Sequence, residues 1–500
     1  ATHAPQPGLT RSSPSRRRGA AKGWISSAQA EERALRVLRF LDEDARWGDA
    51  PAGYVGNSRG VIYRFGGIDP AGLDGPLTGT RKIDLGRVNA VEASVIDTAL
   101  LHLGILTCAA AFDAETTAQR ELRQRADSVL NRTCWEELIE PESGQFFLAW
   151  KPEIQTDGPY FAAPSAFGGF WASHDEAGAR PLTIDYATAE GYMAALLAVG
   201  SATHPVSATV WYKIIREVAP SAGEPVVLTW PGAWFTYAFL TSTYLDPGLG
   251  RDRGSEWGTV SVDWRANTTA TFRAFAALSP SNELILPDAC ELPDATYIAQ
   301  GMPALAVDKT PRFTGALSPY SYQMAIGLGD DFELRAIAAL RSFVARLPEL
   351  YDPLSGLLDT LHPDLAVFPS DAPMLRRTGP WVQNQKWPLN AGAALVAQFN
   401  YLDGGVIWKT AAQHSVMERA IKAIYQSSPP CERQVGLLRP WGHDAWSAAA
   451  GARLLVIPDH YAEVCHVYTP DGLPGEQISY TQIGDVLALH GIAVERSGGP

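Results

Sequence analysis

The sequence predicts an all-α fold in which helix hairpins close into a ring. Eleven stretches carry apolar residues at helical spacing, most of them about 10 to 22 residues long and separated by loops rich in Gly and Pro. Neither a strand–helix–strand alternation nor the glycine fingerprint of a nucleotide-binding loop occurs. A helical solenoid would give similar segments, but the sequence shows no fixed-period repeat. A ring of hairpins buries the apolar stripes against each other and leaves the loops at one end to build a cleft.

Along the chain we expect a leader, a helical domain and a C-terminal extension. Residues 1–25 hold a Pro/Ser-rich stretch with a basic run and are expected to be disordered. The helical domain is expected to span 26–426, and its first helix begins near Ser27 behind a Ser cap. The expected helices cover 27–44, 89–112, 115–135, 188–201, 207–218, 234–245, 259–278, 321–329, 331–350, 389–402 and 412–426. A Gly/Pro/Asp-rich loop is expected at 48–85, a strand-like patch at 144–150 and a mixed extension packed on the ring at 427–500.

Composition excludes several classes of function. Apolar residues make up 46% of the 500, which is enough for a sizeable core. The net charge of −13 disfavours a nucleic-acid partner, because such proteins gain affinity from clustered Lys and Arg. No apolar run reaches the roughly 18 residues of a membrane span. None of the five Cys forms a CxxC pair, so a zinc or redox motif has no support.

Three carboxylates stand out because they lie in apolar sequence. Cleavage of a glycosidic bond needs one acid that protonates the leaving oxygen and a second carboxylate that acts as base or nucleophile. The acid must stay protonated near neutral pH, which an apolar neighbourhood favours. Glu190, Asp97 and Asp359 meet this criterion and are the candidate catalytic residues. For each of them, the alternative interpretation is a structural acid that caps a helix or is buried with a hydrogen-bond partner.

Four passages between about residues 88 and 425 resemble the glucoamylase-like family of bacterial proteins. That family includes endo-β-1,2-glucanases and the related domain of cyclic β-1,2-glucan synthases. The first passage contains Asp97 in "NAVEASVIDTALLHLGIL", and the second contains Glu190 in "YATAEGYMAALLAVGSATHPVSATVWYKIIRE". The third, "WPGAWFTYAFLTSTYLDPGLGRDRGSEW", ends in a turn with Asp246 and Asp252. The fourth combines "GALSPYSYQMAIG", "SGLLDTLHP" with Asp359, and "WPLNAGAALVAQFNYLDGGVIW".

The resemblance implies an (α/α)6 barrel that hydrolyses β-glucan, typically with inversion, and uses no metal or organic cofactor. By position it makes Glu190 the general acid and Asp359 the general base, which can act on water through a substrate hydroxyl. The expected partner is then an oligo- or polysaccharide, β-1,2-glucan above all, and the expected location is periplasmic or secreted. The chain also has 15 Trp, 17 Tyr and 17 Phe, and flat rings can stack on sugars. We expect substrate contacts from the following residues, and about half of the aromatic ones to be ordinary core residues: Trp234, Phe235, Tyr237, Asp246, Tyr320, Trp381 and Trp387.

The sequence departs from the family pattern near the expected cleft. Phe399 stands where the family carries an acid before Asn400, an acid is missing near Asn390, and Tyr192 stands where an Arg is common. Three alternatives therefore stay open. The same site can transfer glycosyl groups instead of hydrolysing them, or the protein can bind glycan without cleaving it. A polysaccharide lyase that uses Tyr320 with Arg265 is the third, although the acidic chain makes a polyanionic substrate less attractive.

Overall fold

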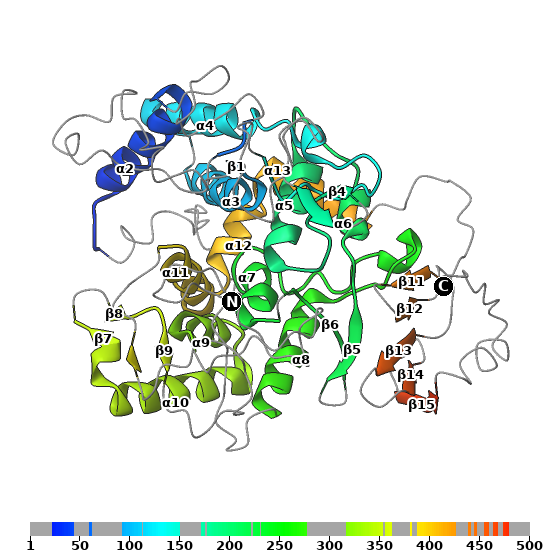
Figure 1. Ribbon diagram of the computed structural model, residues 1–500. Helices are drawn as coiled ribbons and strands as arrows, with labels where there is room; N and C mark the ends of the chain where they lie inside the picture. Colours follow the sequence, from blue (N-terminus) through cyan, green and yellow to red (C-terminus); the bar gives the residue numbers. More distant parts are fainter. Residues whose placement is uncertain are drawn as a thin grey trace, which may run out of the picture.

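Helices dominate the protein (Figure 1). The computed structural model describes residues 23–44, 60–62, 93–112, 114–150, 172–175, 178–221, 224–230, 232–277, 317–353, 356–362, 381–382, 388–426 and five strands between 439 and 479. The α-helices are α2 (Ser27–Arg39), α3 (Val95–Ala111), α4 (Thr117–Leu130), α5 (Ala189–Gly200), α6 (Thr209–Lys213), α7 (Trp234–Thr243), α8 (Trp264–Ala277), α9 (Pro319–Ile326), α10 (Asp330–Arg346), α11 (Pro388–Leu402), α12 (Val406–Ala411) and α13 (Ser415–Ile421). Short 3-10 or π turns are η1 (Phe40–Asp44), η3 (Trp135–Leu138), η5 (Gly254–Trp257), η7 (Pro348–Leu350) and η9 (Lys422–Gln426).

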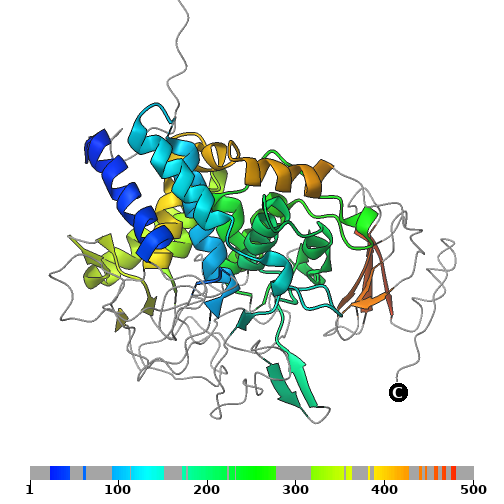
Figure 2. The same cartoon turned by 90° about the horizontal axis from the view of Figure 1, so that it is seen from above.

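The strands are short and antiparallel. They are β1 (Ala93–Ser94) with β2 (Ala149–Trp150), β3 (Ala172–Asp175) with β4 (Gly178–Pro181), β5 (Val218–Ser221) with β6 (Glu224–Val227), β7 (Tyr351–Asp352) with β8 (Gly356–Leu357), β9 (Leu361–His362) with β10 (Trp381–Val382), β11 (Arg439–Trp441) with β12 (Ala445–Ser447), and the sheet of β13 (Leu455–Asp459), β14 (Val464–Tyr468) and β15 (Pro474–Ser479). Figure 2 shows the C-terminal sheet at one side of the helical body. The described part of 427–500 thus consists of strands, whereas residues 1–22 of the expected leader lie outside the described residues.

The inner helices form a closed circuit. Helices α3, α5, α7, α9 and α11 each pack against the next, and α12 packs against both α11 and α3. A second set lies outside them: α4 packs on α3, α13 on α5, α8 on α7 and α10 on α9. The burial of the helices agrees with this inner and outer arrangement. Every residue of the inner helix α7 is buried, whereas the outer helix α4 buries a single apolar stripe. The expectation of a predominantly helical protein is confirmed.

Local signals set most helix boundaries. The first helix begins at Ser27 as expected, and Ser26 with Gln29 forms a capping box. The prediction of one helix over 207–218 was wrong, because α6 ends at Lys213 and Ile215 instead donates its backbone N–H to Asp185 O (2.7 Å). None of the helices in the described part of the chain is both long and apolar enough to cross a membrane.

Candidate active site

The first turns of α3, α5 and α7 lie at the same end of the circuit. β1, which leads into α3, pairs with β2. The residues just before β2 pair in turn with the segment that leads into α5, where Ile184 N donates to Phe146 O (2.7 Å). Between the segments leading into α5 and α7, Trp230 N donates to Ala187 O (3.2 Å). These non-local contacts bring the N-terminal ends of three inner helices together.

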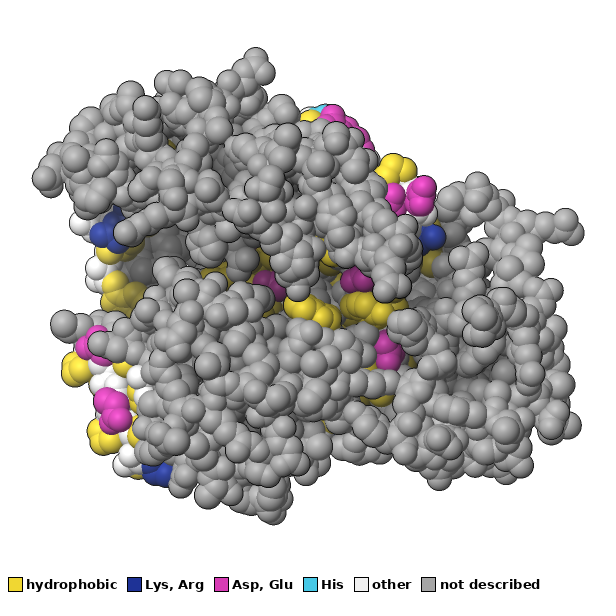
Figure 3. Space-filling model, viewed as in Figure 1, with side chains coloured by type: hydrophobic (Ala, Val, Ile, Leu, Met, Phe, Trp, Pro, Cys, Tyr) yellow, Lys and Arg dark blue, Asp and Glu magenta, His cyan; other side chains and the backbone are white. Residues whose placement is uncertain are grey.

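Two further links add α9 and α11 to this end. The indole Nε1 of Trp234, in the first turn of α7, donates to Ser321 O in the first turn of α9 (3.1 Å). Leu317, just before α9, exchanges two backbone hydrogen bonds with Leu361 (2.8 and 2.9 Å). Viewed from above in Figure 2, the β3–β4 hairpin projects on the side where α3 begins, which is the side that faces the viewer in Figure 1. Figure 3 shows this face, where acidic side chains are visible among hydrophobic ones in a band across the middle.

Glu190 is the one residue of α5 that is not buried. It occupies the second position of the helix, behind the N-cap Thr188, whose Oγ1 accepts a hydrogen bond from Gly191 N (2.9 Å). Gly191 allows the segment before α5 to approach closely, because a Cβ there would lie 2.7 Å from Ile184 Cγ2. A glutamate is the only charged residue of an otherwise apolar helix, and it lies at the end of that helix that borders the loops.

Asp359 is a buried carboxylate at the same end, with 4% of its surface exposed. Its Oδ2 accepts a hydrogen bond from Asn390 Nδ2 (2.8 Å) in the first turn of α11. Two residues further along the chain, the backbone of Leu361 pairs with that of Leu317. The segment that carries Asp359 is thereby joined to the start of α9. An amide donor favours the ionised carboxylate, since a hydrogen bond to the charged form stabilises that form.

Asp97 lies in the first turn of α3, where Ser94 Oγ accepts a hydrogen bond from its backbone N–H (3.1 Å). Its side chain is half-buried. The structure thus brings all three predicted acids to the end of the circuit where the inner helices begin. Among the described residues, no group of three or more His, Cys, Asp and Glu side chains is arranged to hold a metal ion.

Four of the aromatic residues that were expected to contact the substrate are buried in the core instead. Trp234 is fully buried and packs edge-on against Phe272 and Phe275. Tyr237 is also buried, and its hydroxyl accepts a hydrogen bond from Thr229 N (3.0 Å).

Phe235 and Tyr320 are a buried edge-to-face pair with ring centroids 5.9 Å apart. All four rings therefore fill the core and offer no face to a sugar, because neighbouring side chains already cover them.

The remaining predicted contacts fall at different places. Asp246 follows the C-terminal end of α7, and its Oδ1 accepts a hydrogen bond from Gly248 N (2.8 Å) within a turn. It is therefore a turn residue at the end of α7 opposite to Trp234, not a residue of the candidate site. The backbone of Trp381 pairs with His362, three residues after Asp359, but its side chain lies outside the described residues. Trp387 lies outside them altogether.

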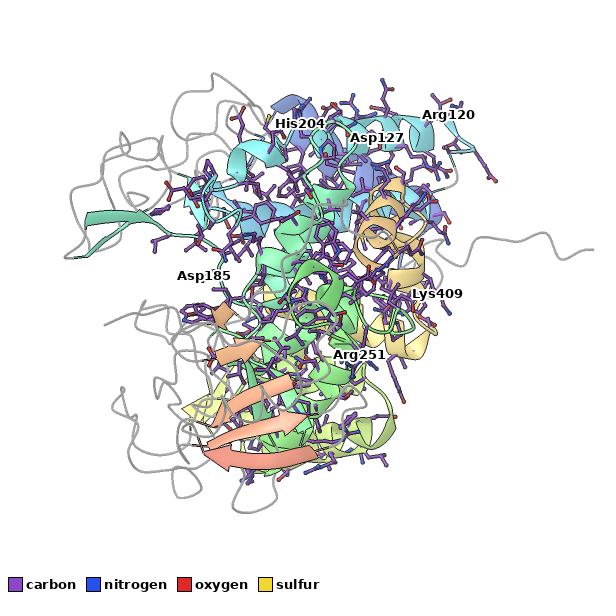
Figure 4. All side chains as sticks on the ribbon, turned by 90° about the vertical axis from the view of Figure 1, so that its right-hand side faces the viewer. Arg120, Asp127, Asp185, His204, Arg251 and Lys409 are labelled. Atoms are coloured by element: carbon purple, nitrogen blue, oxygen red, sulfur yellow. The ribbon has the colours of Figure 1, made fainter. Side chains whose placement is uncertain are left out.

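Asp185 is a carboxyl group that sequence reasoning passed over. It is half-buried five residues before Glu190, and Figure 4 shows it at the side of the molecule that carries the β3–β4 hairpin. Burial raises the pKa of its carboxyl group, although hydrogen bonds from Tyr186 N and from its own backbone N–H counteract this. The signal in the sequence was its place among Ile184, Tyr186 and Ala187, the same apolar setting that selected Glu190.

Several solved structures share this architecture. A Bacteroides uniformis protein provisionally assigned as a glucoamylase is similar over 82% of this chain and 85% of its own, with a TM-score of 0.58 and 16% identity. The endo-β-1,2-glucanase of Chitinophaga pinensis, in complex with sophorotriose and glucose, is similar over 81% and 83%, with a TM-score of 0.56 and 15% identity. A β-1,2-glucanase of Parabacteroides distasonis is similar over 81% of this chain and 52% of its own, with a TM-score of 0.56 and 15% identity.

The shared property is the fold. The resemblance inferred from the four sequence passages is thereby confirmed at the level of structure, since the similar proteins are glucoamylase-type proteins and endo-β-1,2-glucanases. No protein-family model and no curated protein sequence matches the chain. The glucoamylase-like fold and the positions of the acids within it are therefore the basis for assigning a function.

Proposed function

We propose that the protein is a glycoside hydrolase that cleaves β-glucan, most specifically β-1,2-glucan or its oligosaccharides, by an inverting mechanism. The observation that carries the proposal is that Glu190, the one incompletely buried residue of α5, and Asp359, a buried carboxylate, lie at the same end of a glucoamylase-like fold. The circuit of α3, α5, α7, α9, α11 and α12, with helices packed outside it, supports an (α/α)6 barrel as its scaffold.

In this mechanism Glu190 donates its proton to the glycosidic oxygen as the bond to the anomeric carbon breaks. Asp359 takes a proton from water, directly or through a sugar hydroxyl, and the water oxygen attacks the opposite face of the ring. The base has to be ionised before the reaction, and the amide of Asn390 favours that form of Asp359. The products are a shortened glucan and a new reducing end of inverted configuration.

The acid needs the opposite protonation state. The first turn of α5 favours an ionised Glu190, because the helix dipole is positive there. A bound glucan that excludes water from the half-buried side chain favours the neutral acid, since desolvation penalises the charged form. Asp97, at the start of α3, supplies a third carboxylate that can accept hydrogen bonds from sugar hydroxyls. A periplasmic or secreted location belongs to the same proposal, because a polymeric glucan does not cross a membrane unaided.

Substitution of the two acids tests the proposal. Glu190→Gln and Asp359→Asn should each lower the rate of reducing-end release from β-1,2-glucan by about a hundredfold or more, as loss of a general acid or base does. Asp246→Asn is the matched control, because this carboxylate lies in a turn at the other end of α7 and should leave the rate unchanged. Full activity in Glu190→Gln would refute the assignment of the acid.

Product analysis separates the alternatives. Longer glycans among the products would identify a transglycosylase, and unsaturated products that absorb ultraviolet light would identify a lyase. Binding of a glycan without cleavage of any member of a broad panel would identify a non-catalytic binding protein.

A further inference from the structure

A cysteine, a histidine and a glutamate form a cluster away from the candidate active site. Cys134 Sγ lies 3.9 Å from His204 Nε2, and His204 Nδ1 lies 2.6 Å from Glu136 Oε1. Cys134 and Glu136 flank the start of η3, whereas His204 follows α5 at Gly200. The cluster is therefore near the end of α5 opposite to Glu190, roughly 15 Å along the helix axis. In Figure 4, His204 lies near the edge of the molecule, far from Asp185.

The hydrogen bond to Glu136 fixes the role of each imidazole nitrogen. An ionised carboxylate can only accept, so Nδ1 carries the hydrogen that faces Glu136. In the neutral ring, Nε2 is then the acceptor, and it is the nitrogen that faces the thiol. A thiol beside such a base can transfer its proton to Nε2, and the carboxylate stabilises the imidazolium ion that forms.

Both segments of the cluster are held in place. Thr203 Oγ1 donates to Asn131 O (2.8 Å), and His204 N donates to Ser201 Oγ (3.2 Å). On the other side, Thr133 Oγ1 donates to Gly60 O (2.8 Å) next to Cys134. The arrangement of thiol and imidazole therefore does not depend on ordering a loose loop.

The cluster is accessible from solvent. The side chains of His204 and Glu136 are 31% and 50% exposed, and Cys134 is half-buried. The nearby guanidinium of Arg132 is engaged by Asp42 (2.5 Å) and by Ser128 Oγ (3.1 Å). Cys134 Sγ also lies 3.8 Å from the backbone O of Arg132, to which the thiol can donate, and His204 Nε2 is the basic group beside it.

We propose that Cys134, His204 and Glu136 form a reactive-thiol site whose ligand class is a small-molecule disulfide. The proton moves from Sγ to His204 Nε2, and the thiolate attacks one sulfur of the small disulfide. A bond forms between the two sulfurs while the disulfide bond of the small molecule breaks, and the departing thiolate takes the proton from His204. Cys134 is oxidised to a mixed disulfide, and the other half of the small disulfide is reduced to a thiol.

Cys108 on α3 provides an internal control. It is also half-buried, but burial raises the pKa of its thiol to about 11. Cys134 and Cys108 should therefore differ in reactivity in the folded protein. Because unfolding would remove the burial of Cys108, its labelling also reports whether a variant is folded.

The test measures alkylation of the full-length protein by iodoacetamide between pH 5 and pH 9, with the modified peptides identified by mass spectrometry. Cys134 should react with a midpoint below the value of about 8.5 for an ordinary thiol, and His204→Asn should raise that midpoint by about one pH unit or more. At pH 7 the rate should fall about threefold, since the lower thiolate fraction outweighs the higher nucleophilicity of the more basic thiol. Glu136→Gln should change the midpoint in the same direction by a smaller amount.

The same samples are then treated with oxidised glutathione. A glutathione adduct on the Cys134 peptide that dithiothreitol reverses, and that forms more slowly in His204→Asn, is the expected result. An identical midpoint in the wild type and both variants, with Cys108 still protected, would overturn the proposal. Reaction of Cys134 with iodoacetamide but not with oxidised glutathione would overturn the ligand class.

Discussion

Asn390 Nδ2 donates a hydrogen bond of 2.8 Å to Asp359 Oδ2, which joins the first turn of α11 to the segment paired with the start of α9. Both side chains are almost completely buried. Asn390 lies where the family pattern would lead us to expect an acid, and Asp359 is the residue that we propose as the base. An amide at this position keeps a hydrogen bond to Asp359 without adding a second negative charge.

Removal of this amide should change the pH dependence of activity. In Asn390→Ala the ionised form of Asp359 loses a stabilising donor, so the acidic limb of the activity profile should move to higher pH by about one unit. Asn400→Ala is the control in the same helix, because that amide donates to Ser242 O and Thr243 O instead. The control should lose stability and keep the position of the acidic limb. An unmoved limb in Asn390→Ala would mean that this amide does not support the base.

The buried His102 should make the fold sensitive to acid. Burial lowers its pKa to about 4, whereas an unfolded histidine titrates near 6.5. The unfolded state therefore binds more protons between these values, and the free energy of unfolding should fall by about 2 kcal/mol from pH 7 to pH 5 because of this residue.

Urea unfolding at both pH values tests this expectation. In His102→Phe, which keeps an aromatic ring against Trp135, the difference between pH 7 and pH 5 should shrink by that amount. Leu334→Gln, at an exposed position of α10 that carries no titrating group, is the control and should retain the wild-type difference. Equal pH dependence in all three proteins would contradict the role of His102.

Two glycines should respond oppositely to the same substitution. Gly191→Ala should destabilise the protein by about 1 to 3 kcal/mol and lower activity, because the new methyl group meets Ile184 next to Glu190. Gly104→Ala in α3 meets nothing within 4 Å and should stabilise by roughly 0.5 to 1 kcal/mol. Thermal melting and glucan hydrolysis give both results. Normal stability and normal activity in Gly191→Ala would show that the close approach before α5 is dispensable.

The buried ion pair of Arg216 and Asp252 should be a main determinant of stability. The guanidinium Nη2 lies 2.9 Å from Asp252 Oδ2, and both side chains are fully buried. Asp252 also accepts hydrogen bonds from the indoles of Trp211 (2.8 Å) and Trp264 (3.2 Å). Arg216→Met leaves this carboxylate buried without its charge partner and should cost about 3 to 5 kcal/mol in denaturant unfolding.

A matched surface pair provides the comparison. Glu256→Gln removes the partly exposed ion pair with Arg253 and should cost less than about 1 kcal/mol. If the two substitutions cost the same, the buried pair has no special weight. The turn that contains Asp252 would then not depend on its contact with Arg216 for stability.

The sequence predicted what local chemistry determines. Helix starts such as those at Ser27 and Ala189 follow from capping side chains and apolar spacing a few residues away. Non-local pairing was not predictable in the same way. Ile215 lies in a stretch with helical apolar spacing, but its backbone N–H bonds to Asp185 O instead. Asp185 lies thirty residues earlier in the chain, so the local pattern gave no sign of this contact.

The same distinction applies to the candidate site. Glu190 and Asp359 were selected by their apolar sequence neighbourhoods, which the folded chain retains as burial around them. The aromatic predictions were less successful, because a ring that fills the core and a ring that stacks on a sugar look alike in sequence. Trp234 shows this, since only its neighbours Phe272 and Phe275, some forty residues away, reveal that its ring is enclosed in the core. The contact between Asn390 and Asp359 likewise joins two segments that lie 31 residues apart in the sequence.

The most direct test of the proposed mechanism is the configuration of the first product released from β-1,2-glucan, followed by proton NMR during the first minutes of hydrolysis. With Glu190 as acid and Asp359 as base on opposite faces of the scissile sugar, the new reducing end should emerge as the α anomer and mutarotate afterwards. A first product with the β configuration would contradict this pair of roles, because it would require one of the carboxylates to act as a nucleophile.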